Sequence, residues 1–401
     1  MSLTSEGADP AGPVRLGVAG LGRGFMLTLP SLRADPRVRL VAAAARREDQ
    51  RCAFAAEFGG RAHASVAELA ADPDVEAVYI ATPHQMHAEH AALALAGGKH
   101  VLVDKPLAVT LADGAAMVAA ARAACRHLIV GPSHSFDGPV AQAAALIGSG
   151  GIGRVRMIQA FNWTDFLYRP RRPEELATDT GGGVVFSQAV HQIDVVRLLA
   201  GGMATSVFAR TGAWDPARST EGAYAALIGF AGGAFATLTY SGYGRFDSDE
   251  WMGWVGELGA PRSPGGHGRA RRALAGAADA AAEAALKAAR TYGAAEAPPP
   301  APHHEHFGPL LVACEGADLR LTPHGLWRYD DAGATFLPVA AWPAPRRGLI
   351  DALVAAVRQD RAPAQTGAWG LASLELCHAI LTSAATGAPV HPRLQVPPGT
   401  G

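Results

Sequence analysis

The stretch Val14-Arg15-Leu16-Gly17-Val18-Ala19-Gly20-Leu21-Gly22-Arg23-Gly24-Phe25 decides the fold of the first half of the chain. Residues 14–19 are an apolar run that predicts a β-strand, and a glycine turn and a predicted helix follow it. Such glycines let the backbone turn tightly and approach a diphosphate, which the helix N-terminus then stabilises. In this context the turn predicts a dinucleotide site that includes Gly20, Leu21, Gly22, Arg23, Gly24 and Phe25.

Two details of this region bear on the cofactor. Phe25 stands where the third Gly or Ala of the pattern is usual, and Gly24 comes one residue early. The second predicted strand, residues 39–44, ends without the Asp or Glu that binds the ribose 2′-hydroxyl of NAD. Arg46 and Arg47 follow, where they could bind a 2′-phosphate. We therefore expect NAD(P)+ as cofactor, with NADP slightly favoured over NAD.

Strands and helices alternate along the first part of the chain. Strands are predicted at residues 14–19, 39–44, 78–82, 100–103 and 127–130, and helices at about 23–33, 47–58, 65–71, 87–96 and 111–125. Ser65 is the expected N-cap of the third helix, with Glu68 at the capping-box position. The alternation predicts an α/β fold with a parallel sheet covered on both faces, in a first domain at residues 14–135.

The second part, residues 136–396, has a different pattern. Extended runs at residues 154–162, 205–211, 224–230, 233–240, 319–321 and 325–328 predict an open, mainly antiparallel sheet. Helices are expected at 140–147, 183–199, 349–358 and 368–386, with Gly387 capping the last. An Ala-rich insertion at about 245–305 contains a predicted helix at 269–292 between Pro/Gly-rich loops. The open sheet face predicts a homodimer or homotetramer.

The composition excludes several classes of protein. A length of 401 residues allows two domains, and a net charge of −1 without long runs of one sign argues against nucleic-acid binding. Residues 1–13 are polar and no apolar run approaches the ~20 residues of a membrane span, so neither a secretory signal nor membrane insertion is expected. Four widely spaced cysteines favour a reduced, cytoplasmic protein without disulfides or a zinc site.

Three further stretches identify a family. They are Tyr79-Ile80-Ala81-Thr82-Pro83-His84-Gln85-Met86-His87, then Gly98-Lys99-His100-Val101-Leu102-Val103-Asp104-Lys105-Pro106, and then residues 181–194, which begin with three glycines. Together with the glycine turn they resemble the Gfo/Idh/MocA family of NAD(P)-dependent oxidoreductases. The resemblance runs from Val14 to about Val396, apart from the insertion. It implies a doubly wound Rossmann domain followed by an α/β domain with an open, mainly antiparallel sheet.

The resemblance also implies roles for individual residues. Lys105 matches the family lysine near the nicotinamide, and His191 matches the catalytic histidine. Asp104 replaces a glutamate, and Ser187 stands where the family often has an aspartate. Alcohol oxidation needs a group that accepts the hydroxyl proton, which a histidine can do near neutral pH, and a lysine can do so or stabilise an alkoxide. Thr82, Pro83, His87 and Asp104 are placed beside the cofactor.

Residues 162–176 and 304–308 resemble one branch of the family, the 4,5-dihydroxyphthalate (phthalate 4,5-cis-dihydrodiol) dehydrogenases. That resemblance implies oxidation of a cis-dihydrodiol of phthalate or a related aromatic acid. Its carboxylates could bind the arginines of the loop, because guanidinium groups form two parallel hydrogen bonds with carboxylates. His304 and His306 lack the accompanying carboxylate or cysteine ligands of a metal site, so no metal is expected. The expected substrate-binding residues are Tyr168, Arg169, Arg171, Arg172, Ser187, His191, His304 and His306.

Two other functions remain open at this point. A dehydrogenase of a sugar, inositol or sugar acid is the commonest activity of the wider family, although Ser187 and the arginine loop count against it. A non-catalytic dinucleotide-binding sensor is the second alternative, against which the retained Lys105 and His191 argue.

Overall fold

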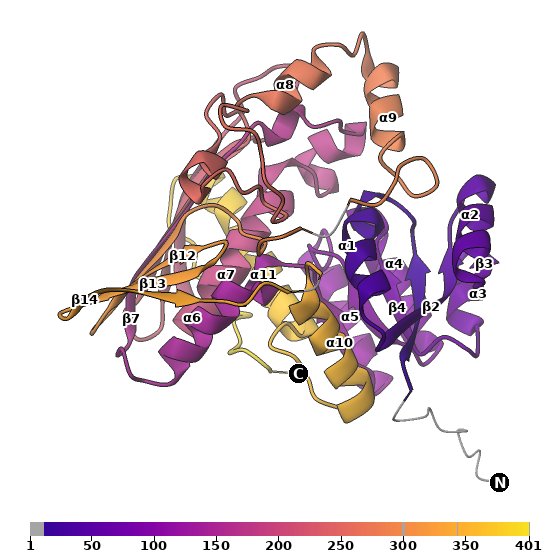
Figure 1. The fold of residues 1–401 in the computed structure, drawn as a ribbon, viewed down its shortest axis with the longest axis horizontal. Coiled ribbons are helices and arrows are strands. Elements are labelled where there is room, and N and C mark those ends of the chain that lie inside the picture. The colour runs from indigo at the N-terminus through magenta and orange to yellow at the C-terminus, as the bar shows by residue number, and fades with distance from the viewer. Residues whose placement is uncertain (1–11, 299–300, 343, 401) are drawn as a thin grey trace.

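The computed structural model describes residues 12–298, 301–342 and 344–400, and almost all of the polar segment at residues 1–13 lies outside them. Two β-sheets lie side by side (Figure 1). The first has six parallel strands in the order β3-β2-β1-β4-β5-β6, the doubly wound Rossmann order. The strands are β1 (Val14–Ala19), β2 (Val38–Ala44), β3 (Arg61–His63), β4 (Ala77–Ile80), β5 (His100–Val103) and β6 (Leu128–Val130).

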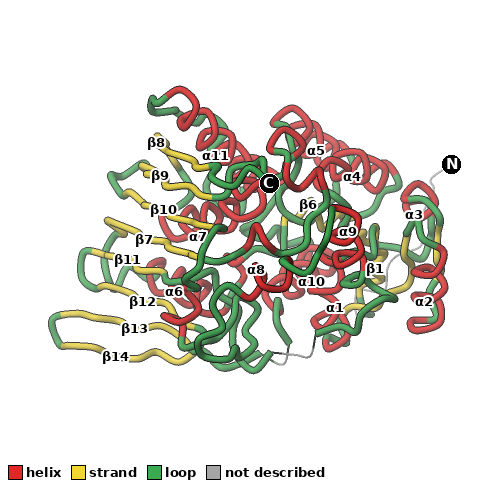
Figure 2. The backbone as a smooth tube through the Cα atoms, turned by 90° about the horizontal axis from the view of Figure 1, so that it is seen from above, coloured by secondary structure: helices red, strands yellow, loops and turns green. Residues whose placement is uncertain are grey.

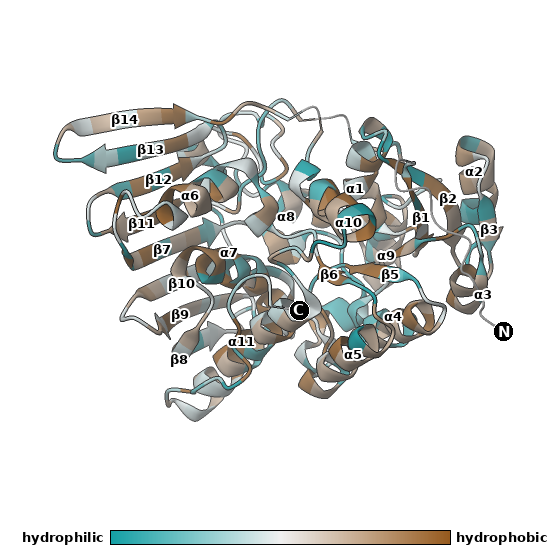
Figure 3. Cartoon of the chain, turned by 90° about the horizontal axis from the view of Figure 1, so that it is seen from below, coloured by the Kyte–Doolittle hydropathy of each residue, from teal (hydrophilic) through white to brown (hydrophobic). Residues whose placement is uncertain are grey.

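Five helices alternate with the strands of the first sheet, and they begin and end close to the predicted positions. They are α1 (Arg23–Ala34), α2 (Glu48–Phe58), α3 (Val66–Ala71), α4 (His87–Ala96) and α5 (Leu111–Ala123). The N-cap of α3 is confirmed, because Ser65 Oγ accepts a hydrogen bond from the Glu68 amide at 3.2 Å. The Glu68 carboxylate accepts from the amide of Ala64, not from that of Ser65. The strands β5 and β6 are almost entirely apolar (Figure 3).

The second sheet has eight strands in the order β14-β13-β12-β11-β7-β10-β9-β8 (Figure 2). Only the β7–β10 pair is parallel, which confirms a mainly antiparallel sheet. Its edge strand β14 and its inner strand β11 were not predicted. The strands are β7 (Val155–Trp163), β8 (Ala204–Gly212), β9 (Ala223–Phe230), β10 (Phe235–Ser241), β11 (Leu310–Cys314), β12 (Asp318–Thr322), β13 (Gly325–Asp330) and β14 (Gly333–Pro338).

The helices α6 (Gly138–Gly148), α7 (Val190–Ala200) and α11 (Gly367–Thr386) pack on one face of the second sheet. The other face leaves Phe208, Leu227 and Leu311 exposed. The homodimer or homotetramer expected from this open face stays a prediction. Within the described chain, no helix is long and apolar enough to cross a membrane.

The helix α10 (Arg347–Gln359) lies in the first domain although it follows both sheets in the sequence (Figure 1). Its buried residues Leu349, Ile350 and Leu353 pack in the same apolar core as Val14 and Leu16 of β1. The two C-terminal helices thus contribute to different cores: α10 packs in the first domain and α11 packs on the second sheet.

The prediction of a single helix at residues 269–292 was wrong. The structure has two short helices there, α8 (Arg269–Leu274) and α9 (Ala280–Ala288). Asp279 separates them because its carboxylate accepts a hydrogen bond from the Ala282 amide at 2.8 Å, which starts a new helix. High helix propensity therefore did not overcome a local capping residue.

The helix that carries His191 begins with a wider π-helical turn, Val185–Ala189, before α7. Glu221 fixes its start, since the carboxylate oxygen Oε1 accepts the Val185 amide at 3.0 Å. Gly183 lies against this carboxylate with a φ of +78°, and a Cβ there would be 2.1 Å from Glu221 Oε1. Only glycine fits at that position without displacing Glu221.

We predict that Gly183→Ala destabilises the protein much more than Gly201→Ala. Both glycines have a positive φ, but a Cβ at Gly201 has no neighbour within 4 Å. The control should lose about 1 kcal/mol from backbone strain alone. Gly183→Ala should lose at least ~3 kcal/mol because the buried Glu221 must also move. Equal losses in urea unfolding would show that Glu221 does not fix this turn.

Candidate active site

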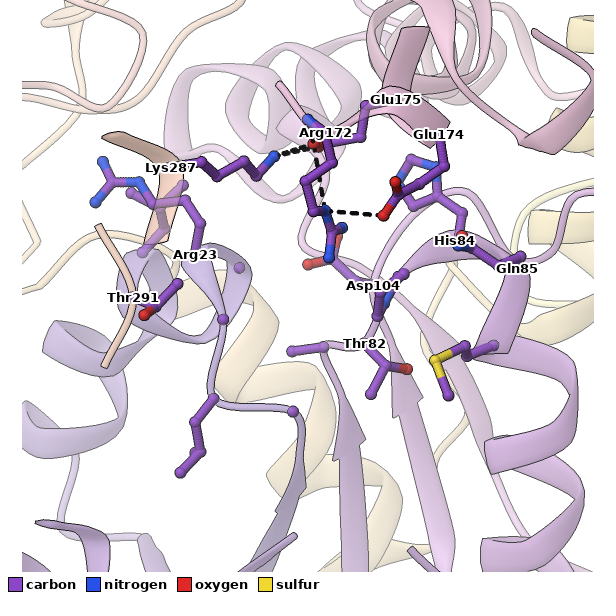
Figure 4. A pocket seen from close by; sticks show the side chains of 18 of the residues that line it. Arg23, Thr82, His84, Gln85, Asp104, Arg172, Glu174, Glu175, Lys287 and Thr291 are labelled. Atoms are coloured by element: carbon purple, nitrogen blue, oxygen red, sulfur yellow. Dashed lines mark hydrogen bonds and ion pairs between the residues drawn. The ribbon is translucent and has the colours of Figure 1, made fainter. Parts of the chain in front are cut away.

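A cavity of about 870 Å³ opens between the two domains, at the carboxyl ends of the parallel strands. Its wall includes the glycine turn, the ends of β4 and β5, the arginine loop and the π-helical turn. Figure 4 shows side chains from both domains facing the same space. Of the residues predicted to form the site, those that line the cavity are Gly20, Leu21, Gly22, Arg23, Gly24, Arg46, Arg47, Thr82, Pro83, Asp104, Lys105, Arg169, Arg171, Arg172, Ser187 and His191.

The glycine turn fits the diphosphate of a dinucleotide. Gly20 has a φ of +92°, and a Cβ there would meet Thr82 Cγ2 at 2.8 Å. A Cβ on Gly22 would meet no atom closer than 3.9 Å, so the space beside the start of α1 is open. No side chain caps that helix N-terminus, which leaves its amides available to an anion.

Gly24 explains why the glycine pattern is shifted by one residue. A Cβ at this position would be 2.7 Å from Asp104 Oδ2, so the close approach of Asp104 requires glycine here. Tyr79 donates to the same carboxylate oxygen at 3.3 Å and keeps it in place. Asp104 therefore packs against the glycine turn. The next residue, Lys105, lines the cavity.

Lys105 links the two domains. Its Nζ donates a hydrogen bond to the Ser187 carbonyl oxygen at 2.7 Å, from the end of β5 to the π-helical turn. The Ser187 hydroxyl donates to the Gly183 carbonyl oxygen and so does not replace a carboxylate partner for the histidine. Burial lowers the pKa of Lys105, against the opposing effects of Asp104 and Glu257.

His191 is 7% exposed and is held by packing rather than by a hydrogen bond. Its ring centroid lies 4.9 Å from those of His134 and of Phe307. Its Nδ1 is buried and has no hydrogen-bond partner, so Nε2 is the nitrogen left to face a substrate. Burial, together with the charges of Lys105 and His134, lowers the pKa of His191 well below its ordinary value and keeps the imidazole neutral.

Sequence reasoning missed one carboxylate of this cavity, that of Glu257 from the insertion. Its Oε2 lies 3.3 Å from Arg169 Nη2 and its Oε1 lies 3.9 Å from His134 Nε2. Although burial opposes ionisation, Arg169 and His134 lower the pKa of Glu257 well below its usual range. Nothing in the local sequence around Glu257 predicts these contacts, because Arg169 and His134 come from distant segments.

His134 is the second group that the sequence did not reveal. It forms a 2.7 Å hydrogen bond through Nδ1 with Asp137. Despite burial, Asp137 and Glu257 raise the pKa of His134 to about 10. The resulting cation lies beside His191 and lowers the pKa of that imidazole.

The three loop arginines differ in how far their charges are already compensated. Arg169 pairs with Glu257, and Arg172 Nε lies 3.1 Å from Glu174 Oε1. The Arg171 guanidinium stacks 3.7 Å above the Phe166 ring, and its Nη1 lies 3.9 Å from Glu175 Oε1. Its Nε is buried without a partner, and burial lowers its pKa to about 10. Arg171 is therefore the loop arginine with the least compensated charge.

Two residues expected at the cofactor do not line the cavity. Phe25 is fully buried and packs edge-on against Tyr292 of the insertion, with 5.5 Å between ring centroids. His87 is fully buried and uses both ring nitrogens on the backbone oxygens of Pro106 and Thr82, each at 2.9 Å. These contacts give both side chains a structural position behind the cavity wall.

Three residues expected to bind substrate also lie outside the cavity wall. The Tyr168 hydroxyl donates to Asp215 at 2.7 Å, and Arg271 covers its ring. His304 and His306 bond the backbone oxygens of Ala340 and Val255, and they line two smaller cavities. Among the described residues, no group of His, Cys, Asp or Glu is arranged to hold a metal ion.

The comparison with known families agrees with this geometry. Residues 14–132 match the oxidoreductase family with an NAD-binding Rossmann fold, and residues 140–260 match the GFO/IDH/MocA C-terminal domain. The chain belongs to the GFO/IDH/MocA family. It is therefore an NAD(P)-dependent oxidoreductase with a Rossmann domain and a second domain built on a mainly antiparallel sheet.

Two dehydrogenases and one crystal structure are similar to this chain. The chain is 48% identical over 373 residues to the 1-carboxy-3-chloro-3,4-dihydroxycyclohexa-1,5-diene dehydrogenase of Comamonas testosteroni. The matched region covers 92% of this chain and 94% of the relative. It is 35% identical over 179 residues to the trans-1,2-dihydrobenzene-1,2-diol dehydrogenase of Mus musculus, across 43% of this chain and 52% of that one. A crystal structure described as a dehydrogenase from Bordetella bronchiseptica RB50 has a TM-score of 0.89 and 40% identity, and it covers 94% of this chain and 100% of its own.

Proposed function

We propose that this family member oxidises a dihydroxycyclohexadiene carboxylate, and that a cis-dihydrodiol of phthalate is the dicarboxylate of this class that it accepts. The observation that carries the proposal is the position of Arg171, whose buried guanidinium faces the same cavity as Lys105 and His191. A carboxylate bound by Arg171 would hold the ring of the diol near these two groups. The similarity to a dehydrogenase of a carboxylated cyclohexadiene diol supports the same class of substrate.

The side chains have separate roles in this reaction. Neutral His191 accepts the hydroxyl proton at Nε2, and the Lys105 ammonium stabilises the alkoxide that forms. Bound nicotinamide supplies the acceptor for the hydride from the same carbon. The product ketone then moves the proton of the neighbouring hydroxyl-bearing carbon to its oxygen. That rearrangement gives an aromatic diol and makes the oxidation run forward.

A substrate panel tests the proposal. Reduced nicotinamide is followed by absorbance with carboxylated and uncarboxylated cyclohexadiene cis-diols, an inositol and a sugar acid. We expect the highest kcat/KM for the carboxylated diols. Turnover of the inositol or sugar acid without turnover of any diol would overturn the proposed substrate class. A protein that binds cofactor but oxidises none of these compounds would instead fit the sensor alternative.

Removal of the lysine should affect the chemical step. Lys105→Ala should lower kcat by at least ~100-fold, because the alkoxide loses its cation. In the wild type, kcat/KM should fall as pH rises through the lowered pKa of Lys105, below its ordinary 10.5. This alkaline limb should be absent in the variant. A near-normal rate, or a wild-type rate that rises through the same range, would contradict the assigned role.

Removal of the least compensated loop arginine should affect substrate binding. Arg171→Ala should raise KM for a carboxylated diol by about 10- to 100-fold, the cost of a charged hydrogen bond. KM for an uncarboxylated diol should change little. Arg172→Ala is the matched control, since Glu174 already pairs with that guanidinium. The same loss of affinity for both diols would show that Arg171 does not bind the carboxylate.

We also propose that Arg46 binds the 2′-phosphate of NADP. Arg47 already pairs with Asp49, whereas the Arg46 side chain forms no hydrogen bond or ion pair in the described chain. Arg46→Ala should therefore raise KM for NADP by about 10-fold and leave KM for NAD unchanged. Arg47→Ala serves as the control. A wild-type kcat/KM that is larger with NAD would overturn the NADP preference.

A further inference from the structure

A segment in the second half of the insertion lines the cavity and contacts both domains. We call residues 280–292, which comprise α9 and the residues after it, the strap. Five of its residues line the cavity: Ala284, Lys287, Ala288, Arg290 and Thr291. In Figure 1 this part of the chain passes over the side of the molecule where the two domains meet. Figure 4 places Lys287 and Thr291 at the cavity, with Thr291 on the same side as Arg23 of the glycine turn.

Tyr292 attaches the strap to the first domain. It is 4% exposed, and its ring packs against Phe25 and Phe58 at centroid distances of 5.5 and 6.4 Å. Its hydroxyl donates to Glu57 Oε2 at 2.8 Å. Gln50 Nε2 donates to the carbonyl oxygens of both Tyr292 and Leu21, each at 3.1 Å. Phe25, the residue that breaks the glycine pattern, thus forms part of the surface that holds the strap.

Two ion pairs attach the other end of the strap to the second domain. Glu283 accepts hydrogen bonds from Arg218 Nη1 at 2.8 Å and from the Arg171 amide at 2.7 Å. Lys287 pairs with Glu175, across the cavity from the glycine turn (Figure 4). The strap is therefore fixed on both sides, and the segment between the attachments contains Arg290.

Arg290 and Arg23 bring two positive charges to the wall of the cavity. Neither guanidinium forms a hydrogen bond or ion pair with any other residue that the structure describes. The Nε atom of Arg23 is buried and unpartnered. Burial, and then the charges of Arg290, Arg169 and Arg346, lower the pKa of Arg23 to about 10. Two cations that line one cavity are stabilised when an anion lies between them.

We propose that the strap covers the bound dinucleotide and that its Arg290, together with Arg23, binds the diphosphate. Arg23 is the first residue of α1, and Arg290 lines the same cavity, so both side chains could contact a diphosphate bound at the glycine turn. Two guanidinium groups match the two negative charges of a diphosphate. The insertion is then a part of the cofactor site that the Rossmann domain alone does not provide. This proposal rests on the nicotinamide-dependent function proposed above.

The test is calorimetric titration of the full-length protein with NAD+, NADP+ and ADP-ribose. Arg290→Ala should raise the Kd of all three ligands by about 10-fold, because each carries the diphosphate. Arg272→Ala is the matched control: it removes the same charge from an exposed position of the insertion that does not line the cavity. Its Kd values should equal those of the wild type.

The other outcomes separate this inference from the proposed function. Unchanged Kd values in Arg290→Ala would overturn the diphosphate contact and leave the dehydrogenase function intact. A loss confined to NADP+ would assign Arg290 to the 2′-phosphate, and a rise only in the KM of the diol would assign it to the substrate. Both results overturn the proposal. A wild type that binds none of the three ligands would overturn the proposed function as well.

Discussion

The hydrogen bond from Lys105 Nζ to the Ser187 carbonyl oxygen is the contact on which the site depends. It joins the end of a Rossmann strand to the first turn of the helix that carries His191. That turn is π-helical, a form often found at functional sites, and Glu221 fixes its start against Gly183. Elements of the two domains thereby meet at one ammonium group, and we expect a change at the Glu221 turn to displace the lysine and the histidine together.

Positive charges gather at the cavity although the whole protein is almost neutral. The net charge is −1, yet arginines from the glycine turn, the loop at residues 169–172 and the insertion line one cavity. Glu257 compensates Arg169, Asp137 and Glu257 raise the pKa of His134, and burial with the two cations near His191 lowers the pKa of that imidazole. The site thus combines a neutral imidazole with uncompensated positive charge, a combination that suits the oxidation of an anionic alcohol that we propose.

The sequence predicted what depends on local patterns. The glycine turn, the strand–helix alternation and the Ser65 cap are properties of neighbouring residues, and all three are present in the structure. The insertion was predicted as one helix because propensity says nothing of the Asp279 cap that divides it. Glu257 and His134 were missed, and Tyr168 was expected in the cavity, because their positions depend on contacts between segments far apart in the chain.

Deuterium transfer tests the central claim most directly. A dihydroxycyclohexadiene carboxylate labelled at each hydroxyl-bearing carbon is oxidised in ordinary water, and the reduced cofactor is isolated for NMR. Our account predicts one deuterium per turnover at nicotinamide C4, with the second deuterium lost to water as the ring becomes aromatic. Recovery of unlabelled reduced cofactor would contradict direct transfer from this substrate in the cavity that contains Lys105 and His191.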